Sequence, residues 1–385
     1  MKLRVLLAGL VTVWVAACTP MLPATDVVVA VSAGGVHTCA LKSTGTIKCW
    51  GDNTYGGLGN GTTVASSTPV DVIGITDATA VVAGVYTSCA LVAGGSVKCW
   101  GWNAFGQLGD GTTTDRSTPT DVVGVAGAVS ITMGTSHSCA LLAGGTAKCW
   151  GDNADEQLGT GTTGNSSTPV DVVGLSGISA LAAGGDKTCA LIGGAVKCWG
   201  QVFFALCHGP GCTLDSPTPI DEGFAGATTL ATGGAHECSI VAGGIVDCRG
   251  SNRHGQIGDG STNWGAASGS PPFVVDDTPL PALGVTGATA VAVGAQSTCA
   301  VVSGGAVTCW GQNTYGQLGN GTTTDTNTPT AVGGLTGATA ISAGFGHACA
   351  VTPTSVQCWG NNTFGQLGDG TTTSSTGPVT VTGLT

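Results

Sequence analysis

A pair of cysteines that closes a short segment ending in Trp-Gly recurs along this chain and constrains its fold more than any other feature. The first copy runs from Cys39 to Cys49 and continues into Trp50 and Gly51. Further copies carry Cys89 with Cys99, Cys139 with Cys149, Cys189 with Cys198, Cys238 with Cys248, Cys299 with Cys309, and Cys349 with Cys358. Such regular repeats overrule the two or three domains that a length of 385 residues would otherwise suggest. The chain is therefore an array of seven similar units.

Each cysteine pair fits the geometry of a β-hairpin. Pairing Cys39 with Cys49 leaves residues 43–45 as a three-residue turn that ends in glycine, where a left-handed residue is favoured. In the fourth repeat the cysteines are one residue closer, and the same register leaves Gly193 and Gly194 as a two-residue turn. The register is retained while the turn length changes. We therefore expect directly opposed cysteines, which are close enough for a disulfide.

The cysteine spacing argues against a metal site. Zinc sites use Cys-x2-Cys knuckles and four converging ligands, and pairs spread one per repeat cannot converge. We predict a disulfide in each repeat and an eighth between Cys207 and Cys212. These account for all but one of the 17 cysteines. So many pairs indicate an oxidising compartment, and the remaining Cys18 needs its own explanation.

The N-terminus supplies that explanation. Lys2 and Arg4 precede an apolar run over residues 5–15, which is too short to span a bilayer as a helix, and the run is followed by Cys18. This pattern resembles the bacterial lipoprotein signal. The resemblance implies that residues 1–17 are removed, that Cys18 carries a lipid, and that residues 18–28 form a short tether. An ordinary signal peptide with a chance cysteine is the alternative.

Within each repeat the sequence predicts four short strands. In the second repeat they lie over residues 79–83, 88–92, 96–100 and 119–123, and they are rich in β-branched residues and punctuated by glycine. No window shows the periodicity of a long helix. Repeats of about 50 residues with four strands each are typical of propeller blades. We therefore predict an all-β fold over residues 29–385: a seven-bladed β-propeller of four-stranded blades, each with a cross-strand hairpin disulfide.

Three segments carry a family resemblance. Residues 100–111, with 310–319 and 359–368, follow the pattern Trp-Gly-x-Asn-x-aromatic-Gly-Gln-Leu-Gly. They resemble the regulator of chromosome condensation repeat, and the resemblance covers roughly residues 29–385. It implies a seven-bladed propeller, and we expect the last strand, over residues 378–381, to complete a blade begun near the N-terminus. The family's exchange activity on a nuclear GTPase does not suit a secreted lipoprotein, but its binding of protein partners does.

Four histidines stand two residues before a repeat cysteine: His37, His137, His236 and His347. Other repeats hold Thr87, Lys187 and Ser297 there, so a structural hydrogen-bonding role is favoured over a metal site. Residues 110–115 and 369–373 are similar to calcium loops, but Asn60, Thr160 and Asn320 at equivalent positions favour a role in the turn. The repeated tryptophans are interpreted as packing residues rather than carbohydrate platforms. We predict no metal and no cofactor.

The composition and motifs also exclude functions. A formal net charge of −11 disfavours binding to nucleic acid or to anionic lipid headgroups. No serine nucleophile motif, phosphate-binding loop or zinc-protease helix is present, so we predict that the chain is not an enzyme.

The repeats depart from their pattern in the fourth and fifth units. The fourth unit replaces the Gly-Gln-Leu-Gly segment with an apolar stretch over residues 201–212, and the fifth unit has arginine where tryptophan is expected and an extension of 11 residues. Both changes follow the Trp-Gly strand, so they belong on the same face of adjacent blades. Grouped aromatic and arginine side chains are typical of interface hot spots. The predicted partner-binding residues are Phe203, Phe204, His208, Arg249, Arg253, His254, Trp264 and Phe273. Sequence drift in two decaying repeats, without a binding role, is the alternative.

These observations predict a lipid-anchored protein of the bacterial cell envelope, in the outer membrane and either periplasmic or surface-exposed. Its expected function is that of a protein–protein interaction module acting through the loops of the fourth and fifth blades. The expected partner is an unidentified envelope or extracellular protein, and the expected contact with the membrane is through the lipid alone. A polysaccharide-binding or hydrolytic propeller, and a structural surface protein without a specific ligand, are the alternatives.

Overall fold

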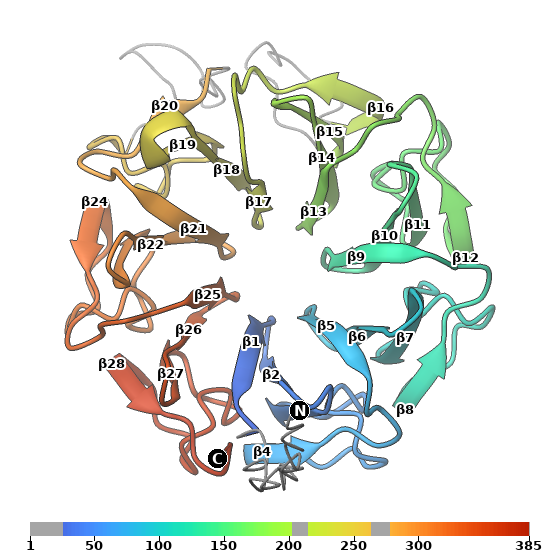
Figure 1. Ribbon diagram of the computed structural model, residues 1–385, viewed down its shortest axis with the longest axis horizontal. Coiled ribbons are helices and arrows are strands. Elements are labelled where there is room, and N and C mark those ends of the chain that lie inside the picture. The colour runs from blue at the N-terminus through green and yellow to red at the C-terminus, as the bar shows by residue number, and fades with distance from the viewer. Residues whose placement is uncertain (1–25, 202–214, 263–277, 385) are drawn as a thin grey trace, which may run out of the picture.

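The computed structural model describes residues 26–201, 215–262 and 278–384. Within these residues seven four-stranded antiparallel sheets stand around a central axis, and each sheet is built from consecutive strands (Figure 1). The innermost strand of each blade comes first in the sequence and the outermost comes last. The predicted all-β, seven-bladed propeller is therefore confirmed.

The first four blades have regular strands. Blade 1 contains β1 (Val28–Ala33), β2 (His37–Lys42), β3 (Ile47–Gly51) and β4 (Ser66–Asp71). Blade 2 contains β5 (Ala78–Ala83), β6 (Thr87–Val92), β7 (Ser96–Gly101) and β8 (Arg116–Asp121). Blade 3 contains β9 (Ala128–Met133), β10 (His137–Leu142), β11 (Ala147–Gly151) and β12 (Ser166–Asp171). Blade 4 contains β13 (Ala180–Gly184), β14 (Lys187–Ile192), β15 (Ala195–Gln201) and β16 (Asp215–Asp221).

The last three blades include the least regular one. Blade 5 contains β17 (Ala231–Thr232), β18 (His236–Val241), a 3₁₀ turn η1 (Ala242–Gly244), β19 (Ile245–Gly250) and β20 (Leu280–Pro281). Blade 6 contains β21 (Ala288–Val293), β22 (Ser297–Val302), β23 (Ala306–Gly311) and β24 (Thr326–Ala331). Blade 7 contains β25 (Ala340–Ala343), β26 (His347–Val351), β27 (Val356–Gly360) and β28 (Ser375–Thr380). Two-residue inner and outer strands make blade 5 the shortest sheet.

The predicted hairpin disulfides are present in all seven blades. The paired cysteines lie directly opposite each other, across a three-residue turn in blade 1 and a two-residue turn in blade 4. Their Cα atoms are 4.0 or 4.1 Å apart throughout. In chain order the bridges join Cys39 with Cys49, Cys89 with Cys99, Cys139 with Cys149, Cys189 with Cys198, Cys238 with Cys248, Cys299 with Cys309, and Cys349 with Cys358.

The eighth predicted bridge, between Cys207 and Cys212, lies outside the described residues, as does Cys18. Each of the seven described hairpins keeps the cysteine register while its turn varies in length. The predicted pairing within each repeat is therefore confirmed.

The expected exchange of a strand between the two ends of the chain is wrong. Strand β28 pairs with β27, with Val379 opposite Cys358, and blade 1 is complete from β1 to β4. The ring closes instead through packing between blades 7 and 1, where Trp50 is buried with Leu367 and Leu384. A shared strand is unnecessary because this boundary buries the same kind of apolar core as the other boundaries.

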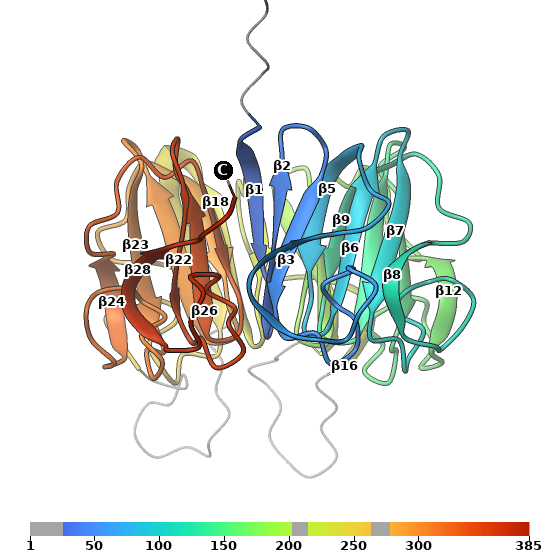
Figure 2. The same ribbon diagram turned by 90° about the horizontal axis from the view of Figure 1, so that it is seen from below.

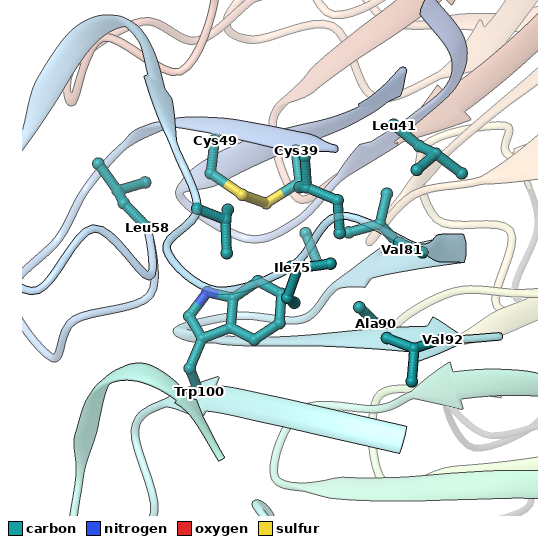
Figure 3. Packing of buried hydrophobic residues seen from close by; sticks show 13 residues of the cluster. Cys39, Leu41, Cys49, Leu58, Ile75, Val81, Ala90, Val92 and Trp100 are labelled. Atoms are coloured by element: carbon teal, nitrogen blue, oxygen red, sulfur yellow. A yellow bond between two sulfur atoms is a disulfide. The ribbon is translucent and has the colours of Figure 1, made fainter. Parts of the chain in front are cut away.

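The core lies between neighbouring blades. At the boundary of blades 1 and 2, Trp100 is buried against the Cys39–Cys49 disulfide, Leu58 and Ile75 (Figure 3). The tryptophan comes from one blade and the disulfide from the previous one, so burial of their apolar surface stabilises the ring rather than a single sheet. The six repeated tryptophans are fully buried, which confirms that they are packing residues. No helix in the described part of the chain is long and apolar enough to cross a membrane.

Antiparallel topology gives the propeller two different ends. The turns between first and second strands and the connections between third and fourth strands emerge at one end, which is the lower end in Figure 2. We call this end the loop face. The hairpin turns between second and third strands and the links to the next blade emerge at the opposite end. Strands β15 and β19 end at the loop face, and strands β16 and β20 begin there.

Candidate functional site

Neighbouring blades are joined by a recurring group of hydrogen bonds, which we call the inter-blade clasp. At the boundary of blades 1 and 2, the indole Nε1 of Trp100 and the hydroxyl of Ser88 both donate to the backbone carbonyl of Gly57, each at 2.9 Å. The Nε2 atom of His37 lies 2.7 Å from the same hydroxyl. Since the hydroxyl proton is directed to the carbonyl, Nε2 of His37 must be the protonated nitrogen and must donate to Ser88. The clasp thus connects one blade to the next through three side chains.

The other histidines occupy the same place in their own blades. His137 contacts Thr188, His236 contacts Thr298 and His347 contacts Thr38, each with 2.8 Å between Nε2 and the hydroxyl. All four rings are buried, and burial lowers the pKa of His37 to about 4 and that of the others to about 3. They are therefore neutral at pH 7. The predicted structural role of the histidines is confirmed.

The turn role of the calcium-like segments is also supported by the contacts. Asp110 accepts hydrogen bonds from the backbone and the hydroxyl of Thr112 and pairs with Arg116. Asn60 accepts the equivalent two bonds from Thr62 without any negative charge. Within the described ranges, no group of three or more histidine, cysteine or acidic side chains is arranged to hold a metal ion.

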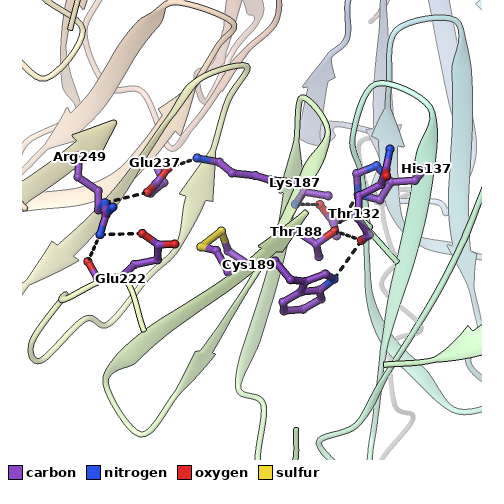
Figure 4. Close-up of a disulfide and its surroundings, with 12 residues drawn as sticks. Thr132, His137, Lys187, Thr188, Cys189, Glu222, Glu237 and Arg249 are labelled. Carbon is purple, nitrogen blue, oxygen red and sulfur yellow. Dashed lines mark hydrogen bonds and ion pairs between the residues drawn. A yellow bond between two sulfur atoms is a disulfide. The ribbon is translucent and has the colours of Figure 1, made fainter. Parts of the chain in front are cut away.

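A buried group of ionic side chains replaces the clasp between blades 4 and 5. Lys187 stands where other blades have histidine, and it forms an ion pair with Glu237 (Figure 4). Arg249 stands where other blades have tryptophan, and its side chain reaches Glu222 at 2.7 Å and Glu237 at 3.3 Å. All four side chains are at most 7% exposed. Burial, and then the charge of Glu237, raises the pKa of Glu222.

Arg249 therefore does not belong to an exposed binding surface, and its assignment as a partner-binding residue is corrected. Its guanidinium also donates to the backbone carbonyl of Glu222 at 2.7 Å. At other boundaries the tryptophan nitrogen uses a carbonyl of the Gly-Gln-Leu-Gly segment of the previous blade. Blade 4 lacks that segment in its sequence, so an arginine with its own acidic partners takes the place of the tryptophan.

Two more of the predicted partner-binding residues lie within the described ranges. Arg253 is exposed on the loop face. His254 is partly buried, and its Nδ1 atom lies 2.7 Å from a carboxylate oxygen of Asp325 in blade 6. Phe203, Phe204, His208, Trp264 and Phe273 lie outside the described residues.

The loop face of blades 1 and 2 carries an aromatic cluster that consists of Tyr55, Tyr86, Trp102 and Phe105. The ring centroids of Tyr55 and Tyr86 are 5.2 Å apart, those of Tyr86 and Trp102 are 6.2 Å apart, and those of Trp102 and Phe105 are 5.4 Å apart. The three pairs meet edge to face, the favoured geometry for aromatic rings. Tyr55 is 36% exposed. The other three rings are partly buried, so the cluster is an ordered aromatic surface that is partly exposed to solvent.

The packing of one connection on the next blade brings these rings together. The connection after β3 rests on blade 2, where the backbone nitrogen of Gly61 donates to the carbonyl of Ser117 at 2.9 Å. Gly56 lies so close to Ser117 that an added Cβ would be 2.5 Å from its Cα. Tyr55, the residue before Gly56, therefore leaves blade 1 at its boundary with blade 2 and reaches Tyr86 and Trp102.

Further aromatic side chains lie on the loop face of blades 6 and 7. Tyr315, Phe345 and Phe364 are each more than 40% exposed. Together with the aromatic cluster they include every Tyr, Phe and Trp of the described residues that is not buried in the core. The opposite end of the propeller has no such side chain among the same residues. The sequence signal was Trp102, because equivalent positions hold polar residues: Asp52, Asp152, Ser251, Gln312 and Asn361.

The loop face of blades 3 and 4 has a different character. Asp152, Asp155 and Glu156 lie on the connection after β11, and Asp186 lies in the turn between β13 and β14. Burial raises the pKa of Asp186, and the charges of Asp155 and Asp152 raise it further. We call these four residues the acidic group. The face thus combines aromatic blades with an acidic sector.

Two sequence models described as the Regulator of chromosome condensation (RCC1) repeat match the chain. One matches residues 28–56, 78–107, 128–157, 288–317 and 338–366. The other matches residues 45–91, 94–141, 146–191, 304–351 and 355–385. Neither matches residues 192–287, where the clasp is replaced by the buried ionic group. A search of curated protein sequences found no match.

Solved structures share the architecture at low sequence identity. Yeast RCC1 (Prp20), in a structure bound to Kap60, is 20% identical with a TM-score of 0.75, and the match covers 89% of this chain and 85% of that one. Human WBSCR16 is 20% identical with a TM-score of 0.73, and the match covers 86% and 88% of the two chains. Prp20p from Saccharomyces cerevisiae, reported with its binding properties to Gsp1p and histones, is 22% identical with a TM-score of 0.71 over 83% and 80%.

These likenesses show the fold alone. The repeat models, in contrast, cover more than half of the chain and include the tryptophan, glutamine and glycine positions that build the clasp. The chain belongs to the regulator of chromosome condensation repeat family.

Proposed function

We propose that the chain is a protein–protein interaction module whose partner docks on the loop face. The observation that carries this proposal is the segregation of aromatic side chains: within the described residues, all those outside the core lie at that one end. Exposed aromatic groups held in ordered positions on a rigid scaffold are typical of interface hot spots. Four of these seven side chains occupy the aromatic position of the repeat: Tyr55, Phe105, Tyr315 and Phe364. The other three, Tyr86, Trp102 and Phe345, stand where no other repeat has an aromatic residue, so the repeat pattern does not account for them.

The proposal includes the loops of blades 4 and 5. Their flanking strand ends, Gln201 and Gly250, lie on the loop face, and Arg253 is exposed beside them. The sequence of these connections is rich in aromatic residues, and it lies in the part of the chain that the family models do not match. Loops that differ from the repeat are where a single partner can be distinguished from others.

We also propose that the protein is anchored in the bacterial envelope, with Cys18 carrying the lipid. The support is the basic and apolar leader, the leftover cysteine and the oxidising compartment that seven buried disulfides require. The full chain should be found in the membrane fraction after expression in a bacterium that processes lipoproteins. The Cys18→Ser variant should be found outside that fraction; equal amounts of both proteins in the membrane would contradict the anchor.

Capture of partners tests the binding function. The full chain, purified in detergent, is compared with a loop-face variant that carries Tyr86→Ser and Trp102→Gln, residues that Ser136 and Gln312 show to be compatible with the fold. The matched control is Val129→Thr at the start of β9, on the opposite end, since Thr79 occupies that position in blade 2. We expect an envelope protein held by the native chain and the control and lost from the loop-face variant. Equal capture by all three would refute docking on this face.

A further bait separates the two parts of the face. It keeps the aromatic cluster and replaces residues 202–214 and 263–277 with the corresponding connection of blade 2. Loss of the partner from this bait is the expected result if the blade 4 and 5 loops contribute to binding. Retention would confine the interface to the regular blades.

A further inference from the structure

We infer that the partner presents an arginine-bearing protein segment, which places guanidinium groups on the aromatic cluster and its remaining cationic side chains at the acidic group. This inference rests on the proposed interaction function and adds the chemistry of the partner. It follows from three properties of the loop face: the arrangement of the rings, the distribution of charge, and the position of the acids next to the rings along the propeller.

The rings of the aromatic cluster are arranged to receive a flat cation. Tyr55 meets Tyr86 at an interplanar angle of 70°, and Trp102 meets Phe105 at 88°. In edge-to-face groups each ring covers only the edge or part of one face of its neighbour, so ring surface remains available. The faces of aromatic rings are negative, and a guanidinium both stacks on them and keeps its donors in water.

The charge of the face selects a cation over other flat groups. In the described turns and connections of this end the acidic residues are Asp52, Asp110, Asp115, Asp152, Asp155, Glu156, Asp186, Asp259, Asp325 and Asp369. The same segments contain one arginine, Arg253, and no lysine, and Arg116 at the start of β8 pairs with Asp110. Three lysines pair instead with the aspartates that end the outer strands β4, β8 and β12, at the other end of the propeller: Lys48 with Asp71, Lys98 with Asp121 and Lys148 with Asp171. Charge complementarity therefore favours a basic partner at the loop face.

The acidic group follows the aromatic cluster along the ring and is assembled in the same way. The connection of blade 1 leans on blade 2 and joins Tyr55 to Tyr86 and Trp102. The equivalent connection of blade 3 carries Asp155 and Glu156 towards blade 4, where Asp186 occupies the turn that corresponds to that of Tyr86. Burial, and then the charges of Asp155 and Asp152, raise the pKa of Asp186. An arginine-containing segment that crosses blade 2 onto blade 3 therefore meets rings and then carboxylates.

A defined peptide tests this inference without knowledge of the natural partner. The probe is a fluorescein-labelled peptide of Gly-Ser-Arg repeated four times, and the comparison peptide has citrulline, an uncharged group of the same shape, in place of every arginine. Binding to the full chain in detergent is measured by fluorescence anisotropy at 50 mM and 500 mM salt. We expect the arginine peptide to bind at least tenfold more tightly than the citrulline peptide at 50 mM salt, and we expect this ratio to shrink at 500 mM.

Variants assign the binding to the two groups. Trp102→Gln should weaken binding of the arginine peptide at least fivefold at both salt concentrations, because ring stacking is lost. The double variant Asp152→Gln with Asp186→Ala should weaken it at least fivefold at 50 mM salt and much less at 500 mM. Residues Gln312 and Ala235 occupy these positions in other blades, so both proteins should fold. Val129→Thr, at the opposite end of the propeller, is the control and should bind as the native chain does.

Three results would overturn the inference: no binding of the arginine peptide at 1 mM, equal binding of the citrulline peptide, or equal binding to the Trp102→Gln variant. None of them would refute docking of a protein on the loop face, which the capture experiment tests separately. Conversely, a captured partner that is not displaced by the arginine peptide would retain the proposed function and refute the proposed chemistry.

Discussion

Single buried carbonyl oxygens join neighbouring blades by accepting two hydrogen bonds each. The carbonyl of Gln107 accepts hydrogen bonds from Ser138 and Trp150 of the next blade, both at 2.9 Å. One backbone oxygen thus satisfies two buried donors, which would otherwise cost free energy. Where a histidine is added, as with His137 and Thr188, it extends this group by one more bond between blades.

The buried histidines should make the protein sensitive to acid. Their folded pKa lies below the unfolded value of about 6.5, so their contribution to stability is complete above that pH and is lost as the pH falls towards 3 to 4. At pH 5 each histidine should lower the free energy of unfolding by about 2 kcal/mol. Urea unfolding at pH 7 and at pH 5 measures this loss of stability. In the His37→Thr variant, which has the residue found at Thr87 in blade 2, the loss between the two pH values should be smaller by the contribution of one histidine.

Glu222 has the opposite effect on stability as the pH falls, so the compared proteins must both retain it. Its raised pKa means that the folded state binds a proton more readily than the unfolded state, so acidification towards the unfolded pKa stabilises the fold. The comparison of native and His37→Thr proteins keeps Glu222 unchanged. A pH dependence that is identical in both proteins would contradict the role given to the histidine.

Gly134 is closely packed against its own blade and the next one. A Cβ added there would lie 2.2 Å from Cε1 of His137 and 2.6 Å from the carbonyl oxygen of Gly185 in the next blade. Gly134→Ala should therefore destabilise the protein by about 1–3 kcal/mol through overpacking. Gly144→Ala, where no atom lies within 4 Å, is the matched control and should leave the urea midpoint nearly unchanged. Equal midpoints for both variants would show that the boundary can relax.

At the scale of strands and blades, the residue type at one position depends on the residue about 50 positions later, in the next blade. Lys187 in β14 faces Glu237 in β18, just as His137 in β10 is followed by Thr188 in β14. The position of Thr188 is held by Glu237 in blade 5, and that of Trp199 by Arg249. The boundary between blades 4 and 5 is thus a separate solution, in which buried charges compensate one another.

This boundary should respond differently to one substitution and to two. Lys187→Met leaves Glu237 with less compensation and should lower the free energy of unfolding by about 3–5 kcal/mol. Adding Glu237→Gln removes the uncompensated charge, while Arg249 remains paired with Glu222. The double variant should therefore be more stable than Lys187→Met alone. Denaturant unfolding of the native protein, both single variants and the double variant measures this coupling. Additive losses would argue against a coupled group.

At the scale of the whole molecule, the ring closes by packing alone. The nitrogen of Trp50 in blade 1 donates to the carbonyl of Gln366 in blade 7 at 2.9 Å, and Thr38 donates to the same oxygen. Both ends of the described chain lie at this boundary, because Val28 packs on the cluster that contains Leu384. No strand of the described residues passes from one end of the sequence to the other.

The molecule should therefore tolerate a change in where the chain begins. A circular permutant that starts at Ala78, with a short linker joining the old ends, is cut between two blades. Its free energy of unfolding should be within about 1 kcal/mol of that of the native protein. A permutant cut at residue 85 separates β5 from β6 and should lose much more stability, since the turn between paired strands is broken. Thermal and urea unfolding compare the two. Equal stability would mean that blades are not the cooperative units.

The sequence alone determined the repeated architecture, because the features that define it are local. Hairpin register, turn length and disulfide pairing depend on residues about ten positions apart, and the structure confirms them at Cys39–Cys49 and Cys189–Cys198. Blade number followed from counting the units. The Trp and His positions were also interpreted correctly, because equivalent residues in a ring cannot converge on one site.

Only the tertiary structure decided how the ring closes, where Arg249 lies and which aromatic side chains meet. Each of these depends on contacts between blades that no local pattern encodes. Arg249 is displayed or buried according to whether Glu222 and Glu237 reach it, and Tyr55 joins Tyr86 and Trp102 because one connection packs on the next blade. The close approach of neighbouring blades therefore turns separate repeat positions into a single surface.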